Sequence, residues 1–112
     1  MIPRELMSES GKKIVQAIEE VTGIPFEEWA RSERTRECVK CRQIYCFNAR
    51  KAGKAGKPMM TQNVIAGHLG WSDHTAVLRS ERSYKNDYQT NLEFRETADK
   101  VSEKLLPLHH EN

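Results

Sequence analysis

Apolar residues recur every three or four positions along most of this 112-residue chain, and this spacing constrains its fold more than any other feature. Such a period places apolar side chains on one face of an α-helix, whereas strands need strict alternation. No run alternates apolar and polar residues with β-branched enrichment, and no Asn-Gly or Asp-Gly hairpin turn occurs. The sequence therefore predicts an all-α fold, and its length suits one domain.

Glycine- and proline-containing turns divide this pattern into five to six expected helices. They fall at about residues 10–22 and 25–29, from about 35 to before 53, at 61–69, from 72 onward, and at 91–106. The expected apolar positions of the third and the last of them are Val39, Ile44, Cys46 and Phe47, and Leu92, Val101, Leu105 and Leu106. The stretch KAGKAGKP at 51–58 indicates a loop. We expect the domain core at about 12–89, with the C-terminal helix added to it.

The fourth and fifth expected helices form a pair. Thr61 is expected to cap the first of them, which stops at Gly70, and Ser72 to cap the second, with Asp73 in its first turn. Two helices joined by a tight glycine-containing turn make a helix-turn-helix. The apolar residues of the pair that should pack inward are Val64, Ile65, Leu69, Val77, Tyr84 and Tyr88.

The second helix of the pair has an outward face of its own. The residues expected there are His74, Thr75, Leu78, Arg79 and Arg82. They offer hydrogen-bond donors and acceptors, a methyl group and two guanidinium groups near the start of the helix. Recognition helices use such side chains to reach base edges in the major groove of DNA.

Basic side chains are concentrated in the middle of the chain. Residues 31–57 contain nine basic and two acidic residues, a net charge of +7, although the whole chain has only +2. The flanking segments 1–30 and 58–112 are net acidic. Such clustering is typical of a protein that binds a polyanion, and a merely solvated run of charge is the alternative.

Two motifs in these regions resemble a known family. Residues 73–78 (DHTAVL) follow Leu69-Gly70, and residues 40–44 (KCRQI) lie upstream. They resemble the C-terminal DNA-binding domain of the bacterial replication initiator DnaA, in which a glycine and an arginine precede Asp-His-Thr-Thr-Val-Leu, and an Arg-Pro-Arg-Gln helix lies upstream. The register extends from about Ile14 to Tyr88 without a large gap.

The resemblance implies double-stranded DNA as the partner. It implies that Arg42 lies in the minor groove, that Asp73, His74 and Thr75 read the major groove, and that the basic loop clamps phosphates. Together with the outward helix face, the candidate base-reading residues are Arg42, Asp73, His74, Thr75 and Arg79. The candidate phosphate-binding residues are Arg36, Lys40, Arg50, Lys51, Lys54, Lys57, Ser72 and Arg82.

The chain also departs from the family pattern. Ser72 replaces the arginine, Ala76 the second threonine and Cys41 the proline, which bears on the target sequence more than on the binding mode. No Walker loop of the form GxxxxGK[ST] is present. We therefore expect a stand-alone DNA-binding domain without an ATPase module, in the bacterial cytoplasm near the nucleoid, at replication origins or regulatory sites.

Other classes of function find less support in the residues. The Ser, His and Asp residues of the chain do not form a known catalytic motif, so we expect no enzyme and no cofactor. Cys38-x-x-Cys41 lacks the second pair of ligands that structural zinc sites have, so we expect no metal. No membrane span is expected, and the oligomeric state is left open. The alternative function is a protein-interaction module with a degenerate DNA-reading face, whose acidic outer helices dock a partner.

Overall fold

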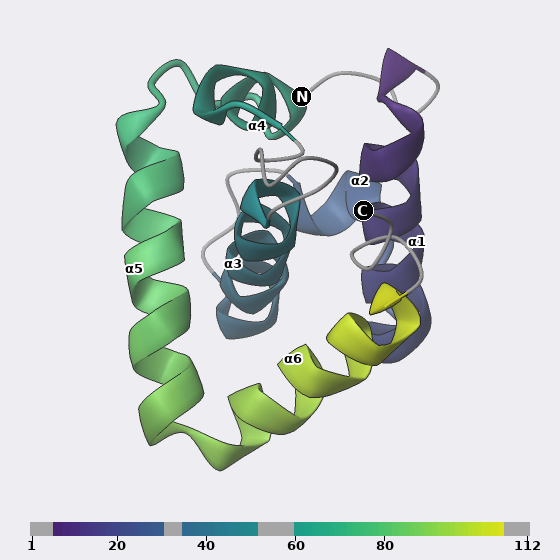
Figure 1. Ribbon diagram of the computed structural model, residues 1–112, viewed down its shortest axis with the longest axis vertical. Coiled ribbons are helices and arrows are strands. Elements are labelled where there is room, and N and C mark those ends of the chain that lie inside the picture. The colour runs from purple at the N-terminus through teal and green to yellow at the C-terminus, as the bar shows by residue number, and fades with distance from the viewer. Residues whose placement is uncertain (1–5, 31–34, 52–59, 107–112) are drawn as a thin grey trace.

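Side-chain caps and glycine turns divide the chain into helices close to the expected places. The structure, a computed structural model, describes residues 6–30, 35–51 and 60–106. Over these ranges the chain forms six helices and no strand: α1 (Glu9–Thr22), α2 (Phe26–Trp29), α3 (Arg36–Arg50), α4 (Gln62–His68), α5 (Thr75–Thr90) and α6 (Leu92–Lys104) (Figure 1). They share one hydrophobic core, so the prediction of an all-α single domain is confirmed.

Four of the helices begin at a side-chain cap. An oxygen of each capping residue accepts a hydrogen bond from the backbone N–H three residues later, and the caps are Ser8, Thr35, Thr61 and Asn91. These bonds satisfy backbone donors that lack a partner inside the helix. The caps at Thr35 and Thr61 fall where the sequence predicted helix starts.

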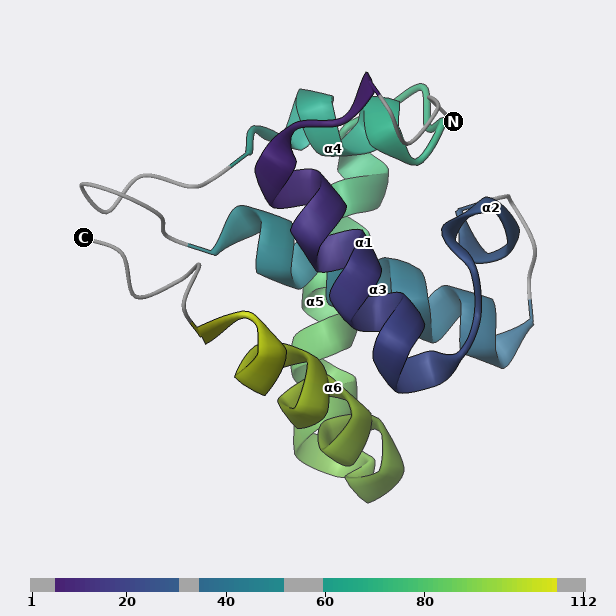
Figure 2. The same ribbon diagram turned by 90° about the vertical axis from the view of Figure 1, so that its right-hand side faces the viewer.

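The central element is α3, which packs against each of the other five described helices. Figures 1 and 2 show it running through the middle of the molecule, with α1, α5 and α6 around it. Ile44, Tyr45 and Cys46 are fully buried on it, because helices surround it on several sides. Trp29 of α2 is also fully buried, and its ring meets Phe26 edge-on at 5.0 Å between centroids. Trp29 is therefore a packing residue.

The α4–α5 pair lies where the sequence predicted a helix-turn-helix. The two helices pack together and are joined by residues 69–74. Gly70 has a φ of 71°, a left-handed conformation that glycine adopts without steric cost. The backbone N–H of Trp71 then donates to the carbonyl of Ala66 at 2.8 Å, which closes the turn. Both figures show α4 at the end of the molecule where α5 begins.

α3 crosses α5, which stands upright in both figures while α3 runs across the view in Figure 2. From the start of α3 to its end, Lys40, Gln43 and Arg50 contact Glu93, Asp87 and Glu81, which lie progressively earlier in the chain. Lys40 therefore lies beyond the end of α5, next to the start of α6. Since α5 has 16 residues, its two ends are about 24 Å apart.

Four apolar residues predicted to pack inward are exposed instead. They are Val39, Val64, Leu92 and Leu106, with exposed fractions of 36%, 45%, 69% and 46%. In α6 the buried positions are Phe94, Ala98, Val101 and Leu105. This set follows the helical period of three to four, whereas Leu92 and Leu106 lie off it. The prediction for α6 was therefore right at Val101 and Leu105 and wrong at its two outer leucines.

Candidate nucleic-acid interface

The first turn of α5 is organised by Asp73. One oxygen of its carboxylate, Oδ1, accepts hydrogen bonds from the backbone N–H and the hydroxyl of Thr75, both at 2.9 Å. These two bonds hold the pKa of Asp73 below its usual range. The prediction that Ser72 caps this helix was wrong, because α5 begins at Thr75 and Asp73 closes its first turn. Ser72 is exposed in the preceding loop.

Four of the five predicted base-reading residues lie together at this end of the molecule. His74 is exposed, and its Nδ1 lies 3.5 Å from Asp73 Oδ1. Thr75 is half-buried and donates its hydroxyl proton to Asp73, while Arg79 is exposed one turn further along α5. The start of one helix therefore carries a hydrogen-bond acceptor, an imidazole, a hydroxyl with its methyl and a guanidinium.

Arg42, the fifth predicted base reader, lies inside the molecule. It is only 8% exposed, and its Nη1 donates to the carbonyl oxygen of Trp29 at 2.8 Å. The guanidinium thereby ties α3 to α2. A side chain that enters the minor groove has to project from the protein surface. We therefore replace the predicted minor-groove role of Arg42 with a structural one.

The charges of α5 are divided between its two sides. Its two carboxylates are bonded to α3: Glu81 Oε1 accepts from Arg50 Nε at 3.2 Å, and Asp87 Oδ2 accepts from Gln43 Nε2 at 3.3 Å. Its three basic residues, Arg79, Arg82 and Lys85, are exposed, and none of them forms an ion pair with another described residue. We call these three residues the α5 basic strip.

Lys85 was not among the sequence-predicted site residues. Arg79, Arg82 and Lys85 follow one another at intervals of three residues, so the helical period that placed Arg79 and Arg82 outward also covers Lys85. The signal was therefore present in the sequence. What the sequence did not show is that both carboxylates of the same helix are engaged on its inner side.

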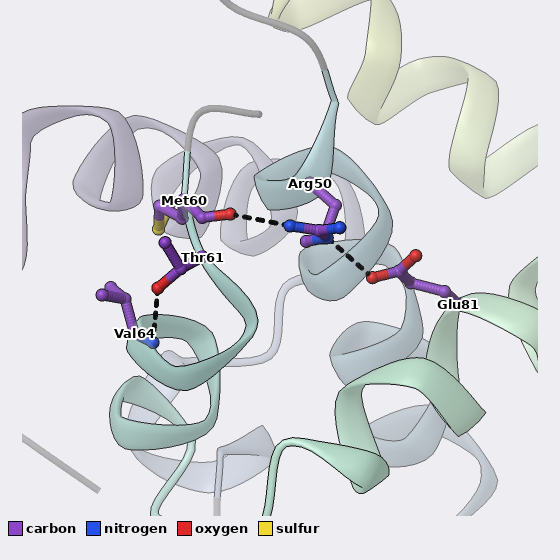
Figure 3. A network of polar contacts seen from close by, with 5 residues as sticks. All are labelled: Arg50, Met60, Thr61, Val64 and Glu81. Atoms are coloured by element: carbon purple, nitrogen blue, oxygen red, sulfur yellow. Dashed lines mark hydrogen bonds and ion pairs between the residues drawn. The ribbon is translucent and has the colours of Figure 1, made fainter. Parts of the chain in front are cut away.

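Arg50 connects three elements (Figure 3). At the end of α3, its Nε donates to Glu81 of α5, and its Nη1 donates to the carbonyl of Met60 at 3.4 Å, just before α4. Thr61, the next residue, accepts a hydrogen bond from the N–H of Val64 and starts α4. The Arg50 side chain is 27% exposed. Its donors are thus directed into the protein, whereas the sequence predicted a phosphate contact.

The other predicted phosphate-binding residues do not form one surface. Lys40 pairs with Glu93 at 4.0 Å, near the end of α5, and exposed Arg36 lies four residues earlier, at the start of α3. Lys51 lies with its Nζ 5.6 Å from the centre of the Phe47 ring. Lys54 and Lys57 lie outside the described residues. Arg82 is the one predicted phosphate contact that belongs to the α5 basic strip.

A buried hydrogen bond holds α4 against α3. The hydroxyl of Tyr45 and Nδ1 of His68 lie 2.6 Å apart, and both residues are buried. Burial lowers the pKa of His68 below its ordinary value and raises that of Tyr45. The Tyr45 hydroxyl also approaches Met60 Sδ at 3.9 Å. This bond fixes the position of α4, and hence of the turn that leads into α5.

A solvent-open cleft of about 350 Å³ lies between α3, α5 and α6. Phe47, Tyr84 and Tyr88 form its aromatic wall, in which the Phe47 and Tyr84 rings stack at 3.9 Å between centroids. Lys51 and Lys85 also line it. Because the ring faces of Phe47 and Tyr84 pack on each other, the cleft offers ring edges and ammonium groups to a ligand.

The cysteines lie apart from this interface. Cys38, Cys41 and Cys46 are all buried with free thiols, and burial raises the pKa of Cys41 to about 11 and that of Cys46 to about 12. Within the part of the chain that the structure describes, no three potential metal ligands come together. A thiol with a raised pKa is a poor nucleophile at neutral pH.

Among the described helices, none combines the length and the apolar character that crossing a membrane requires. Compared with protein-family models, curated proteins and solved structures, the chain matches none of them.

Proposed function

We propose that this chain binds double-stranded DNA sequence-specifically, with α4 and α5 as its helix-turn-helix. The observation that carries the proposal is the division of charge on α5. Glu81 and Asp87 are bonded to α3, while the α5 basic strip faces solvent without ion-pair partners among the described residues. A helix that withdraws its carboxylates and exposes its cations fits a polyanion.

In this proposal the start of α5 enters the major groove. Asp73, His74 and Thr75 lie in its first turn, where side chains reach base edges and the helix N-terminus favours nearby phosphate. Asp73 can accept from cytosine N4, and Thr75 can contact a thymine methyl. Arg79 follows one turn later as a further base reader. Arg82 and Lys85 then contact phosphates, which position the protein and carry no sequence information.

The resemblance of residues 73–78 to the DnaA motif supports the same proposal and adds a setting. By that resemblance the bound sites are replication origins or regulatory sites in the bacterial cytoplasm. Ser72 and Ala76 stand where the family has an arginine and a threonine, so we propose that the preferred sequence differs from that of the family.

The proposal is tested by duplex binding followed by site selection. Fluorescence anisotropy with a short labelled duplex at low salt is expected to show saturable binding, and selection from random duplexes is expected to yield a common site. Arg82→Gln should weaken binding to all duplexes. Its matched control, Lys100→Gln, removes the same charge from α6 beside α1 and should not. Failure of the folded protein to bind any duplex at low salt would contradict the proposal.

A second candidate is a protein-binding role, and the cleft between α3, α5 and α6 favours it. Its aromatic ring edges and its two lysines fit a bulky apolar side chain flanked by carboxylates. If this chain binds no duplex DNA but binds a protein partner at this cleft, the protein-binding role replaces the DNA-binding role.

A further inference from the structure

Glu81 occupies a sensitive position on α5. It lies between Arg79 and Arg82 in the sequence and four residues before Lys85. On a helix, residues four apart are neighbours, and a glutamate on the N-terminal side of a lysine is the favourable arrangement for an ion pair. A free Glu81 carboxylate would therefore pair with Lys85 and cancel one charge of the α5 basic strip.

The structure shows Glu81 held elsewhere. Its Oε1 accepts from Arg50 Nε at 3.2 Å, and the two side chains are 20% and 27% exposed (Figure 3). Arg50 is itself fixed by its second bond, from Nη1 to the carbonyl of Met60. Arg50 also lies in the last turn of α3, where a cation is favourable because the C-terminal end of a helix carries a partial negative charge.

We propose that Arg50 is a positioning residue for DNA binding, which acts by holding Glu81 away from Lys85 and from DNA phosphates. This inference rests on the proposed function of α5. It assigns Arg50 a role other than the phosphate contact that its charge predicted. In this role the Arg50–Glu81 pair contributes no net charge to the interface, and the α5 basic strip keeps all three of its cations.

A positioning role and a phosphate-binding role of Arg50 predict different results for the double variant Arg50→Gln/Glu81→Gln, which leaves the net charge unchanged. Arg50→Gln alone weakens DNA binding in either case. If Arg50 is a positioning residue, adding Glu81→Gln removes the released carboxylate and restores binding. If Arg50 contacts a phosphate, that contact stays lost in the Arg50→Gln/Glu81→Gln variant.

The experiment measures affinity for one generic duplex over a range of salt concentrations. Each phosphate contact contributes about 0.9 to the slope of log K against log salt, so losing one lowers the affinity about eightfold at 0.1 M salt. We expect Arg50→Gln to lose about this much affinity and to have a slope shallower by about 0.9. The double variant should return to the wild-type affinity and slope, and the control Lys100→Gln should match the wild type throughout.

A double variant that stays about eightfold weaker, with the shallower slope, would overturn the inference and leave Arg50 as a phosphate ligand. Thermal unfolding of every variant precedes the binding measurements. Arg50→Gln could fail to fold only because it leaves Glu81 unpaired. In that case the affinity and slope of the double variant alone distinguish the two roles of Arg50, since that variant contains no unpaired carboxylate at this position. A wild-type protein with a flat salt dependence would contradict the proposed function itself, which is a distinct outcome.

Discussion

At the scale of single residues, Asp73 determines how α5 presents its first turn. One carboxylate oxygen fixes both the backbone and the hydroxyl of Thr75, and the imidazole of His74 lies 3.5 Å from the same atom. The side chains of His74 and Thr75, two of those that the proposal places at base edges, are thus arranged around the carboxylate of Asp73. Such preorganisation lowers the entropy that is lost when side chains are ordered on binding.

Replacing His74 with alanine is expected to cost about 1–3 kcal/mol on the preferred site and much less on random duplex, because only base contacts distinguish sequences. The ratio of the two affinities, measured by anisotropy, checks this. Because His74 is exposed, the thermal unfolding temperature should stay close to that of the wild type. A folded His74→Ala variant with an unchanged ratio would show that this residue does not read bases.

Thr75 permits a matched pair of substitutions. Thr75→Val keeps a methyl group and loses the hydroxyl bonded to Asp73, whereas Thr75→Ala loses both. If the methyl contacts a thymine, Thr75→Val should keep the preference for that base pair and Thr75→Ala should lose it. Site selection with each variant measures the preference, and equal loss in the two variants would assign the reading to the hydroxyl.

The buried Tyr45–His68 pair makes stability depend on pH. Burial lowers the pKa of His68 below its ordinary value of 6.5, so around that pH the unfolded chain binds a proton that the folded protein does not. The free energy of unfolding should therefore fall as the pH drops from about 7.5 to about 5.5. Urea unfolding at several pH values measures this, and His68→Gln should flatten the dependence. An unchanged pH dependence in His68→Gln would assign the effect to other groups.

At the scale of elements, the sequence predicted the helices better than their faces. Polar caps and glycine turns act locally, so the starts at Thr35 and Thr61 could be predicted from neighbouring residues alone. The exposed leucines of α6 could not, because Leu92 and Leu106 are as apolar as the core residues and only packing distinguishes them. At the start of α5, Ser72 and Asp73 are both residue types that favour helix caps, but the residue before the helix is His74, and Asp73 bonds to Thr75 instead.

Two exposed glycines allow a test of this local control. Gly23 ends α1 with a φ of 75°, whereas Gly67 lies within α4, and a Cβ at either would meet no atom within 4 Å. Gly23→Ala should destabilise the protein by about 1–2 kcal/mol, because the left-handed conformation strains an L-residue. Gly67→Ala should stabilise it by about 0.5–1 kcal/mol through helix propensity. Chemical denaturation of both variants measures the difference, and the same sign for both would contradict this account.

At the scale of the whole molecule, the basic residues that the structure describes between 36 and 51 do not gather at the proposed interface. Arg42 is buried against Trp29, Arg50 is bonded to Glu81, and Lys40 lies at the opposite end of α5 from His74. These placements depend on which residues of other helices lie nearby, which the chain order does not show. The outward face of α5 could be predicted because it depends only on the period of one helix.

The salt dependence of DNA binding tests whether the α5 face, and not the overall charge, meets the duplex. Each phosphate that is contacted should contribute about −0.9 to the slope of log K against log salt. Arg82→Gln should make it shallower by about 0.9, because Arg82 belongs to the α5 basic strip. Arg36→Gln removes the same charge from the exposed start of α3, outside the α5 basic strip, and should leave the slope unchanged. Equal changes in the two variants would show that the chain binds DNA through diffuse charge, and the orientation proposed for α5 would then be wrong.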